Sequence, residues 1–458
     1  MESNRSAWFG LYLLVGLMFV GLFAVGRLFQ DPETVQTLRA FLSPDENAAP
    51  RETFPMPEDS AAIPPGTAHV VRRDVPAAAS RAAGPTSEAV FQRVAARWNR
   101  AFGHRILGSR ELWQESGNRV AERLRLDLDT RTRHLAVYSA ELRLPKLLGA
   151  EPTQITLYTD GRNRPLELLL TFANRGSIPP QEFDRRIARD DLDVGRSLGG
   201  LLGFAPKEER VAPGGLAKTF QEWKQDGMRV RYFPKINDYV AVSITPASAP
   251  PRPRPPGPDF WPRQVQRNAM GDALIRDIPL VRQGYKPYCV PVTIERVLHY
   301  LHTPENMFAL AAAGDVGYHG CNTFTIYRIM QLRIAAQGLD MEFRPEKLRS
   351  VDQVRGSIDQ GLPVLWLVSG YVDTFLNALA RTEQRSGAVN DRTWRLDLLG
   401  ANRRRPRIAR GQHHSVLIAG YNDQTRELAV IDEMGLLWIT EEEAERISQK
   451  AVMPIVRR

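Results

Sequence analysis

The stretch QGYKPYCVPVTIERVLHYL, residues 283–301, decides how the second half of this chain folds. After Cys289 its apolar residues recur at the spacing of one helix face, which predicts an amphipathic helix packed against a core. Those residues are Val290, Ile294, Val297, Leu298 and Leu301. Helices tolerate proline only in their first turn, so Pro291 places the helix start close to Cys289. The thiol therefore stands where helix N–H groups lower a thiol pKa; the plainer alternative is a buried cysteine that only fills space.

A base for such a thiol is offered by GQHHSVLIAGYNDQTRELAVIDEMG, residues 411–435. The runs HSVLIAGY and ELAVID are typical of buried strands, and the polar NDQT between them indicates a hairpin turn. A hairpin folded about the centre of that turn places His414 opposite Glu433, whereas a one-residue bulge or a three-residue loop makes Asp432 the partner. In each case a carboxylate comes to lie beside His414.

Two histidines and two acidic residues compete for these roles. Neighbouring residues of a strand point to opposite faces, and His414 is favoured over His413 because it directly begins the apolar strand. Asp432 ends a buried run, whereas Glu433 is expected to meet solvent. A metal site built from Cys289, His413, His414 and Asp432 is disfavoured, because adjacent histidines on one strand cannot readily ligate one ion. No metal or cofactor is predicted.

Together these segments resemble the double-glycine leader peptidase family, the bacteriocin-processing branch of the papain-like cysteine peptidases, in its stand-alone form. In that family a glutamine stands six residues before the cysteine, a helix follows the cysteine, and a His-led strand precedes one that ends in Asp. The resemblance implies that Gln283 is an oxyanion donor and Cys289 the nucleophile. It implies that His414 is the base and Asp432 its orienting group. The implied fold is papain-like α+β with an antiparallel sheet, in which IDQGLPVLWLV, residues 358–368, supplies the strand between the two halves.

The resemblance implies a hydrolase, a thiol protease that cleaves a peptide or protein substrate through an acyl-enzyme. A catalytically inactive binding module with the peptidase fold and a cell-wall peptide amidase are the alternatives. The chain departs from the family at Val290, where glycine is frequent, and at Glu433, where the family has proline. It carries about forty extra residues, 370–410, and it lacks a P-loop, so it is not the ATP-driven exporter to which such peptidases are often fused.

The composition is that of a folded protein: 458 residues, 43% hydrophobic and 25% charged. The net charge of +9 and the pI near 9.6 come from arginines spread along the chain, which favours anionic surroundings such as lipid headgroups or a cell-wall polymer. No zinc-finger spacing or RNA-binding signature accompanies this charge, so nucleic acid is not a predicted partner. Two cysteines, Cys289 and Cys321, cannot form a disulfide framework, although a single bridge between them stays open.

Near the N-terminus, SAWFGLYLLVGLMFVGLFAVG, residues 6–26, carries no charge and is long enough for a helix that crosses a bilayer. A cleaved signal peptide is the alternative, because AVG at 24–26 is a passable small-residue site. We expect an uncleaved, single-pass signal anchor with the C-terminal body on the extracytoplasmic side of the membrane.

The remaining chain divides by composition. The expected parts are a membrane anchor (1–30), a flexible stalk rich in Pro, Ala and Ser (31–86), an α+β domain of unknown function (87–245), a stiff proline-rich linker (246–260) and the peptidase-like domain (261–458). The α+β domain is predicted from helical patterns followed by two strand pairs, QITLYTD with PLELLLTFAN and RVRYFP with DYVAVSIT.

Overall fold

The computed structural model describes the chain from residue 88 to residue 458 with short gaps. The gaps are 109–111, 142–143, 176, 204–206, 211–218, 236–237, 249–258, 285–287, 315, 317–322, 386 and 405–412. The expected membrane segment, the stalk, most of the linker and Cys321 lie outside the described residues. Among the helices that are described, none has both the length and the apolar character needed to cross a membrane.

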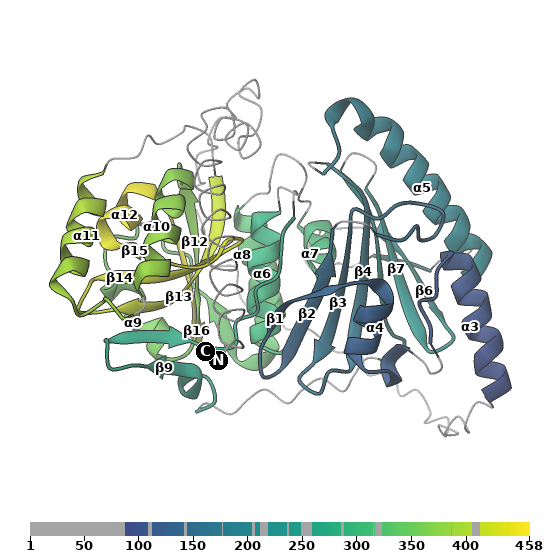
Figure 1. The fold of residues 1–458 in the computed structure, drawn as a ribbon, viewed down its shortest axis with the longest axis horizontal. Helices are drawn as coiled ribbons and strands as arrows, with labels where there is room; N and C mark the ends of the chain where they lie inside the picture. The colour runs from purple at the N-terminus through teal and green to yellow at the C-terminus, as the bar shows by residue number, and fades with distance from the viewer. Residues whose placement is uncertain are drawn as a thin grey trace, which may run out of the picture. The chain divides into compact units, whose positions relative to one another are not determined.

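The first sheet has eight antiparallel strands (Figure 1). In sheet order they are β1 (Asp127–Arg131), β2 (Leu135–Ala140), β3 (Gln154–Asp160), β4 (Pro165–Asn174), β8 (Tyr239–Pro246), β7 (Met228–Lys235), β6 (Thr219–Gln225) and β5 (Lys207–Arg210). Both predicted strand pairs are confirmed, because β3 pairs with β4 and β7 pairs with β8.

Helices cover one face of this sheet. They are α3 (Glu88–Phe102), the short η1 (Leu112–Gln114), α4 (Gly117–Leu124) and α5 (Pro180–Leu202). Strand residues such as Tyr138 and Leu157 share an apolar cluster with Trp98 of α3 and Val194 of α5. The next residue along β3, Tyr158, points to the opposite face and belongs to a different apolar cluster. Both faces of the sheet are therefore buried.

The second sheet also has eight antiparallel strands. In order, six of its strands are β11 (Leu339–Met341), β16 (Ser448–Arg457), β12 (Val364–Ser369), β13 (His413–Asn422), β10 (Asp272–Ile275) and β9 (Val265–Arg267). The remaining two, β14 (Glu427–Asp432) and β15 (Gly435–Thr440), branch from β13, because β14 pairs with β13 and β15 pairs with β14. The strand expected within residues 358–368 is β12. The α+β class with antiparallel sheets is confirmed.

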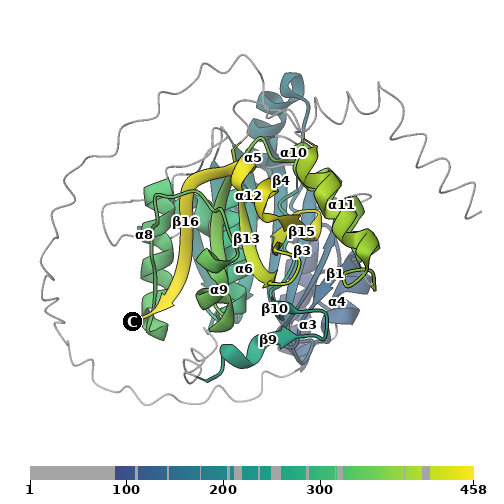
Figure 2. The same cartoon turned by 90° about the vertical axis from the view of Figure 1, so that its left-hand side faces the viewer.

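The second sheet is accompanied by seven α-helices and two short 3-10 helices within the described residues. In chain order they are η2 (Pro262–Gln264), α6 (Cys289–Tyr300), α7 (Met307–Ala313), α8 (Thr323–Ile334), η3 (Ala335–Gln337), α9 (Asp352–Asp359), α10 (Val372–Arg385), α11 (Arg392–Arg403) and α12 (Glu441–Ile447). Figure 2 shows α10 and α11 at the same end of the sheet as β15. These two helices fill the insertion expected at residues 370–410.

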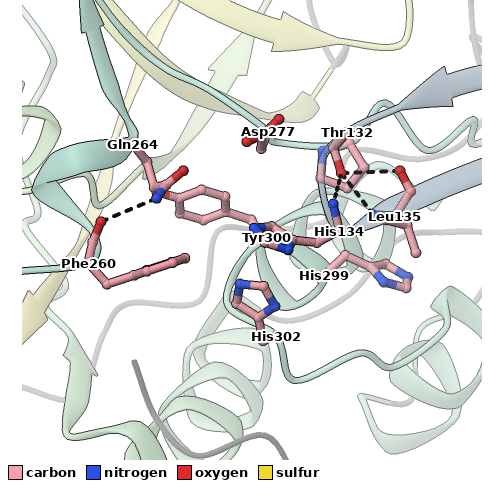
Figure 3. Close-up of a pocket in the computed structure, with 10 residues that line it drawn as sticks. Thr132, His134, Leu135, Phe260, Gln264, Asp277, His299, Tyr300 and His302 are labelled. Carbon is pink, nitrogen blue, oxygen red and sulfur yellow. Dashed lines mark hydrogen bonds between the residues drawn. The ribbon is translucent and has the colours of Figure 1, made fainter. Parts of the chain in front are cut away.

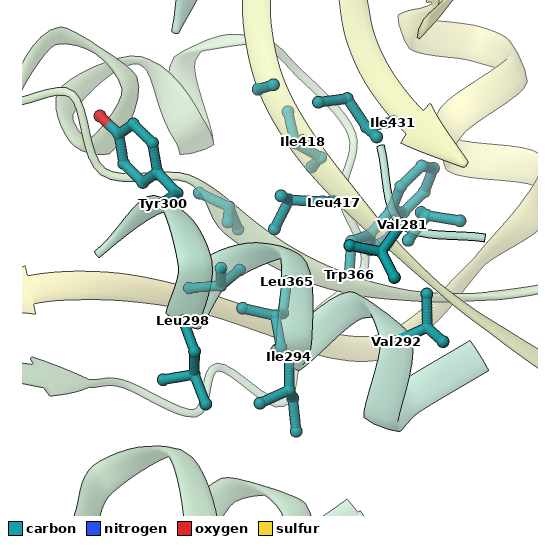
Figure 4. Packing of buried hydrophobic residues seen from close by; sticks show 14 of the residues in the cluster. Val281, Val292, Ile294, Leu298, Tyr300, Leu365, Trp366, Leu417, Ile418 and Ile431 are labelled. Atoms are coloured by element: carbon teal, nitrogen blue, oxygen red, sulfur yellow. The ribbon is translucent and has the colours of Figure 1, made fainter. Parts of the chain in front are cut away.

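Helix α6 carries the predicted apolar face into the core beneath the second sheet. Ile294 and Leu298 have no exposed surface, and they lie in one cluster with Leu365 of β12 and Leu417 of β13 (Figure 4). Burial of side chains of this size stabilises the fold by roughly 1.5–3 kcal/mol each. The helix begins at Cys289, as the position of proline in its first turn predicts.

The same helix is buried on its other side by the first sheet. Tyr239 of β8 lies 5.7 Å from the ring of Tyr288 and 4.8 Å from that of Phe308, measured between ring centroids. The hydroxyl of Tyr158 donates to the Glu295 carboxylate at 2.6 Å, and both side chains are fully buried. Helix α6 therefore lies between two sheets, which leaves almost none of its length in contact with solvent.

Glu167 of β4 adds an ionisable group to this interface. Its Oε1 accepts hydrogen bonds from Asn306 at 2.7 Å and from Ser243 at 2.6 Å. Burial raises the pKa of Glu167 to about 7, and the neighbouring carboxylates of Glu305 and Glu295 act in the same direction. Its proton is therefore held more tightly in the folded protein than in the unfolded chain.

We expect Glu167 to make the folded state less stable as the pH rises from 5 to 8. The unfolded chain releases this proton first, so the contribution to stability is lost as the pH rises through the folded value of about 7. Glu167→Gln cannot ionise and should be more stable than the parent at pH 8 by about 2 kcal/mol, with little difference at pH 5. Urea unfolding at both pH values measures this, and the same loss of stability in both proteins would contradict it.

Candidate active site

Cys289 is the first residue of α6, where the backbone N–H groups of the first helical turn have no partner within the helix. It carries a free thiol and is half-buried. The buried Thr293 hydroxyl lies 2.7 Å from the Cys289 carbonyl oxygen and 3.0 Å from that of Ser415 in β13. Thr293 thus ties the start of α6 to the strand that carries His414.

His414 and Asp432 lie on neighbouring strands of one hairpin. His414 Nε2 is 2.6 Å from Asp432 Oδ1, and the Asp432 carboxylate is 4% exposed. Burial raises the pKa of Asp432, but the charge of His414, the hydrogen bond to it and the charge of Arg296 together lower that pKa below its ordinary value. The carboxylate is therefore ionised beside the imidazole.

The register in which β13 pairs with β14 differs from that of a hairpin folded about the centre of its turn. Asn422 pairs with Glu427 next to the turn, and a bulge between Ile418 and Gly420 then shifts the pairing by one residue. Without that shift, alternation would put Asp432 on the opposite face from His414. The expectation that His414 lies directly opposite Glu433 is wrong. The structure has a bulge, although its ladder starts from a longer turn than expected, and the carboxylate that comes to lie beside His414 is that of Asp432.

The thiol of Cys289 forms a hydrogen bond with His414. Because Nε2 of His414 is engaged by Asp432, Nδ1 is the nitrogen left for the thiol. Burial raises the pKa of Cys289, but this hydrogen bond, the charge of His414 and the backbone N–H groups of Ser415 and Val290 together lower it. Burial also lowers the pKa of His414, but the charges of Asp432 and Tyr371 and the hydrogen bonds to Asp432 and Cys289 together raise it well above its ordinary value. These opposite shifts favour a thiolate paired with an imidazolium.

His413 lies on the other face of the strand. It is exposed, and its Nδ1 accepts a hydrogen bond from Gln449 Nε2 at 2.6 Å. The structure therefore brings together Cys289, His414 and Asp432, and it leaves His413 outside the group.

Gln283 lies in the segment that leads into α6. It is half-buried and directly precedes Gly284, whose N–H donates to Glu433 Oε1 at 3.0 Å. Glu433 follows Asp432, so the segment of Gln283 lies against the end of β14. Glu433 is only partly exposed to solvent, and its carboxylate holds this backbone. The oxyanion role of Gln283 stays a prediction.

Tyr371 is a neighbour of the site that the sequence did not reveal. Its ring stacks on that of His414 with centroids 4.5 Å apart and planes 15° from parallel. β12 pairs with the start of β13, with Ser369 opposite His413, and Tyr371 follows the end of β12 by two residues. An aromatic face favours a cation, which here is the imidazolium. The signal that could have found Tyr371 is this strand pairing.

A separate pocket lies at the far end of α6. It is lined by His299, Tyr300 and His302 together with His134 and Phe260 (Figure 3). A helix of this length separates the pocket from Cys289 by roughly 15 Å, so it is not part of the thiol site. Burial lowers the pKa of His302 to about 4, which keeps it neutral. Within the described residues, no group of three or more His, Cys, Asp or Glu side chains could hold a metal ion.

Comparison with known proteins gives a distant likeness. No protein-family model matches the chain, and no curated protein matches it. Among solved structures, it is similar to a double-glycine motif protease from an AMS/PCAT transporter, crystallised in complex with the leader peptide. The two are 11% identical with a TM-score of 0.25, over 40% of this chain and 93% of that chain. A likeness at this level assigns no chemistry, which has to come from the contacts within the chain.

Proposed function

We propose that this protein is a cysteine peptidase that hydrolyses peptide bonds through an acyl-enzyme. The observation that carries most weight is the chain of contacts from Cys289 through His414 to Asp432, with the thiol pKa lowered and the imidazole pKa raised. A nucleophile, a base in contact with it and a group that orients the base are what acyl transfer requires.

In this mechanism the Cys289 thiolate attacks the carbonyl carbon of the scissile peptide bond. The oxyanion that forms is stabilised by the Cys289 backbone N–H and the Gln283 side chain. His414 gives its proton to the leaving amine as the C–N bond breaks, and Asp432 keeps the imidazole in the useful orientation. Water then attacks the thioester, His414 takes up a proton from it, and the carboxylic acid product leaves Cys289.

The proposal also includes the location of the protein at a membrane. The uncharged run at residues 6–26 supports a single-pass anchor with the body on the extracytoplasmic side. There the net charge of +9 suits an anionic cell-wall polymer, which makes a cell-wall peptide amidase the second candidate. Both reactions use the same nucleophile and base on an amide bond.

The test is the rate of iodoacetamide alkylation at Cys289 against pH, followed by peptide mass spectrometry on the full chain in detergent. We expect alkylation of the parent to persist well below the pKa of an ordinary thiol. In His414→Ala the thiolate loses its counter-charge, so its profile should move to higher pH and the rate at pH 6 should fall by more than about tenfold.

His413→Ala is the matched control, because His413 is the next residue and lies on the other face of the strand. It should leave the profile of Cys289 unchanged. A parent profile like that of an ordinary thiol, an equal effect of the two histidine variants, or a Cys289 peptide linked to Cys321 would rule out the peptidase mechanism.

A further inference from the structure

The segment that carries Gln283 is held at two points, one on each side of that residue. After it, Gly284 donates its N–H to Glu433 Oε1 at 3.0 Å. Before it, the carbonyl oxygen of Val281 accepts two hydrogen bonds from the Arg296 guanidinium, from Nε at 3.1 Å and from Nη2 at 2.7 Å. Only two residues, Arg282 and Gln283, lie between the two anchoring points.

The two anchoring residues, Arg296 and Glu433, belong to the same helix and hairpin as the residues of the thiol site. Arg296 lies on α6, two turns after Cys289, and is 2% exposed. Glu433 directly follows Asp432 at the end of β14. The helix that presents the thiol and the strand that presents the carboxylate therefore also fix the segment of Gln283.

The free-energy cost of burying the charged Arg296 side chain suggests that its position is functionally required. Burial disfavours its charge and lowers its pKa, and the charges of Asp432 and Glu433 offset this effect only in part. A buried guanidinium is expensive to keep in a fold, yet the hydrogen bonds described for it go to one backbone carbonyl rather than to a substrate-facing group. Hydrogen bonds from or to an ionised group are the stronger ones, and here both anchors are of that kind.

We propose that Glu433 and Arg296 are positioning residues that hold Gln283 where it can donate to the oxyanion. This inference rests on the proposed peptidase function and deepens it. Donors to an oxyanion act only when they are fixed in place before the reaction, and loss of one such donor costs about 100-fold or more in rate. Neither anchor touches the thiol or the imidazole in this role; each acts through the backbone next to Gln283.

Two small reagents separate this role from the reactivity of the thiol. p-Nitrophenyl acetate reacts by attack of the thiolate on its carbonyl: the S–C bond forms, an oxyanion appears on the carbonyl oxygen, and p-nitrophenolate leaves. Iodoacetamide reacts by displacement of iodide at a saturated carbon, so no oxyanion forms. The ratio of the acetylation rate to the alkylation rate at Cys289 therefore reports stabilisation of the oxyanion, separately from the reactivity of the thiolate.

In Glu433→Ala we expect acetylation to fall by about tenfold or more while alkylation stays within about twofold of the parent. Glu433→Gln keeps a carbonyl acceptor for Gly284 and should recover most of the acetylation. Gln283→Ala should lower the ratio by about 100-fold, and Glu433→Ala added to it should change the ratio by less than about twofold. Glu442→Ala, an exposed glutamate of α12, is the control that should match the parent.

An unchanged ratio in Glu433→Ala, or a loss of the same size with and without Gln283, would overturn this inference while the peptidase function stands. Alkylation that is slow in the parent and insensitive to His414→Ala would instead overturn the proposed function, and the inference with it. Glu433 is the residue to change first because it is only partly buried, whereas removal of Arg296 acts on the interior of α6.

Discussion

Asp432→Asn is expected to slow acetyl transfer to Cys289 by at least about 100-fold and to move its alkylation profile to higher pH. Asparagine keeps the size of the side chain but removes the negative charge that raises the pKa of His414. The pKa of His414 then falls, the imidazolium loses its proton at lower pH, and the pKa of Cys289 rises because its counter-charge is gone. Acetylation with p-nitrophenyl acetate and alkylation against pH measure the two effects.

The same hairpin offers a matched control for this variant. Asp423 lies in the turn between β13 and β14, where its 43% exposed side chain pairs with Arg355. Asp423→Asn also removes one negative charge from the hairpin, but it should leave both measurements unchanged. If the two variants behave alike, or if Asp432→Asn keeps the parent profile, Asp432 does not act on His414 and the triad is wrong.

Arg385→Ala is expected to lower the free energy of unfolding by about 3–5 kcal/mol. Arg385 is 5% exposed, and its guanidinium makes two hydrogen bonds to Asp272, at 3.0 and 2.7 Å, and one to Glu427 at 3.2 Å. It also lies 3.6 Å from the centre of the Trp438 ring. Its removal leaves two carboxylates buried without their counter-charge, at the turn end of the hairpin that carries His414.

Urea unfolding measures this loss of stability, and an exposed ion pair provides the control. Arg349 is 69% exposed and pairs with Glu445 at 3.4 Å, so Arg349→Ala should cost no more than about 1 kcal/mol. Equal losses in the two variants would mean that the buried cluster does not hold β10, β14 and α10 together.

The elements of the site could be predicted from the sequence because their signals are local. A proline in a first turn places the start of α6, and two apolar runs about a polar turn give the β13–β14 hairpin. The register could not be predicted in the same way. The bulge next to Gly420 lies where β10 crosses close to β13, and a Cβ on Gly420 would collide with the Ala273 carbonyl oxygen. Ala273 is far away in the sequence, so the turn alone carries no trace of this contact.

The burial of two polar residues of α6 could not be predicted either, because it depends on residues outside the helix. Helical periodicity predicts one apolar face and one solvated face, which would leave Glu295 and Arg296 in water. They are 0% and 2% exposed. The first sheet covers Glu295 through Tyr158, whereas Arg296 is held against the Val281 carbonyl. The partners that satisfy them, Tyr158 and the Val281 carbonyl, cannot be read from the helix itself.

Because α6 is buried between two sheets, the two halves of the protein cannot easily be separated or exchanged by recombination of their gene segments. A gene fragment that begins at residue 261 would encode the thiol, the base and the carboxylate, yet it would leave Tyr288 and Phe308 without the Tyr239 ring that covers them. Such a fragment would expose an apolar surface and the Glu295 carboxylate together. The first sheet is thus structurally required by the half that carries Cys289, and a recombination that replaced one without the other would have to rebuild this surface.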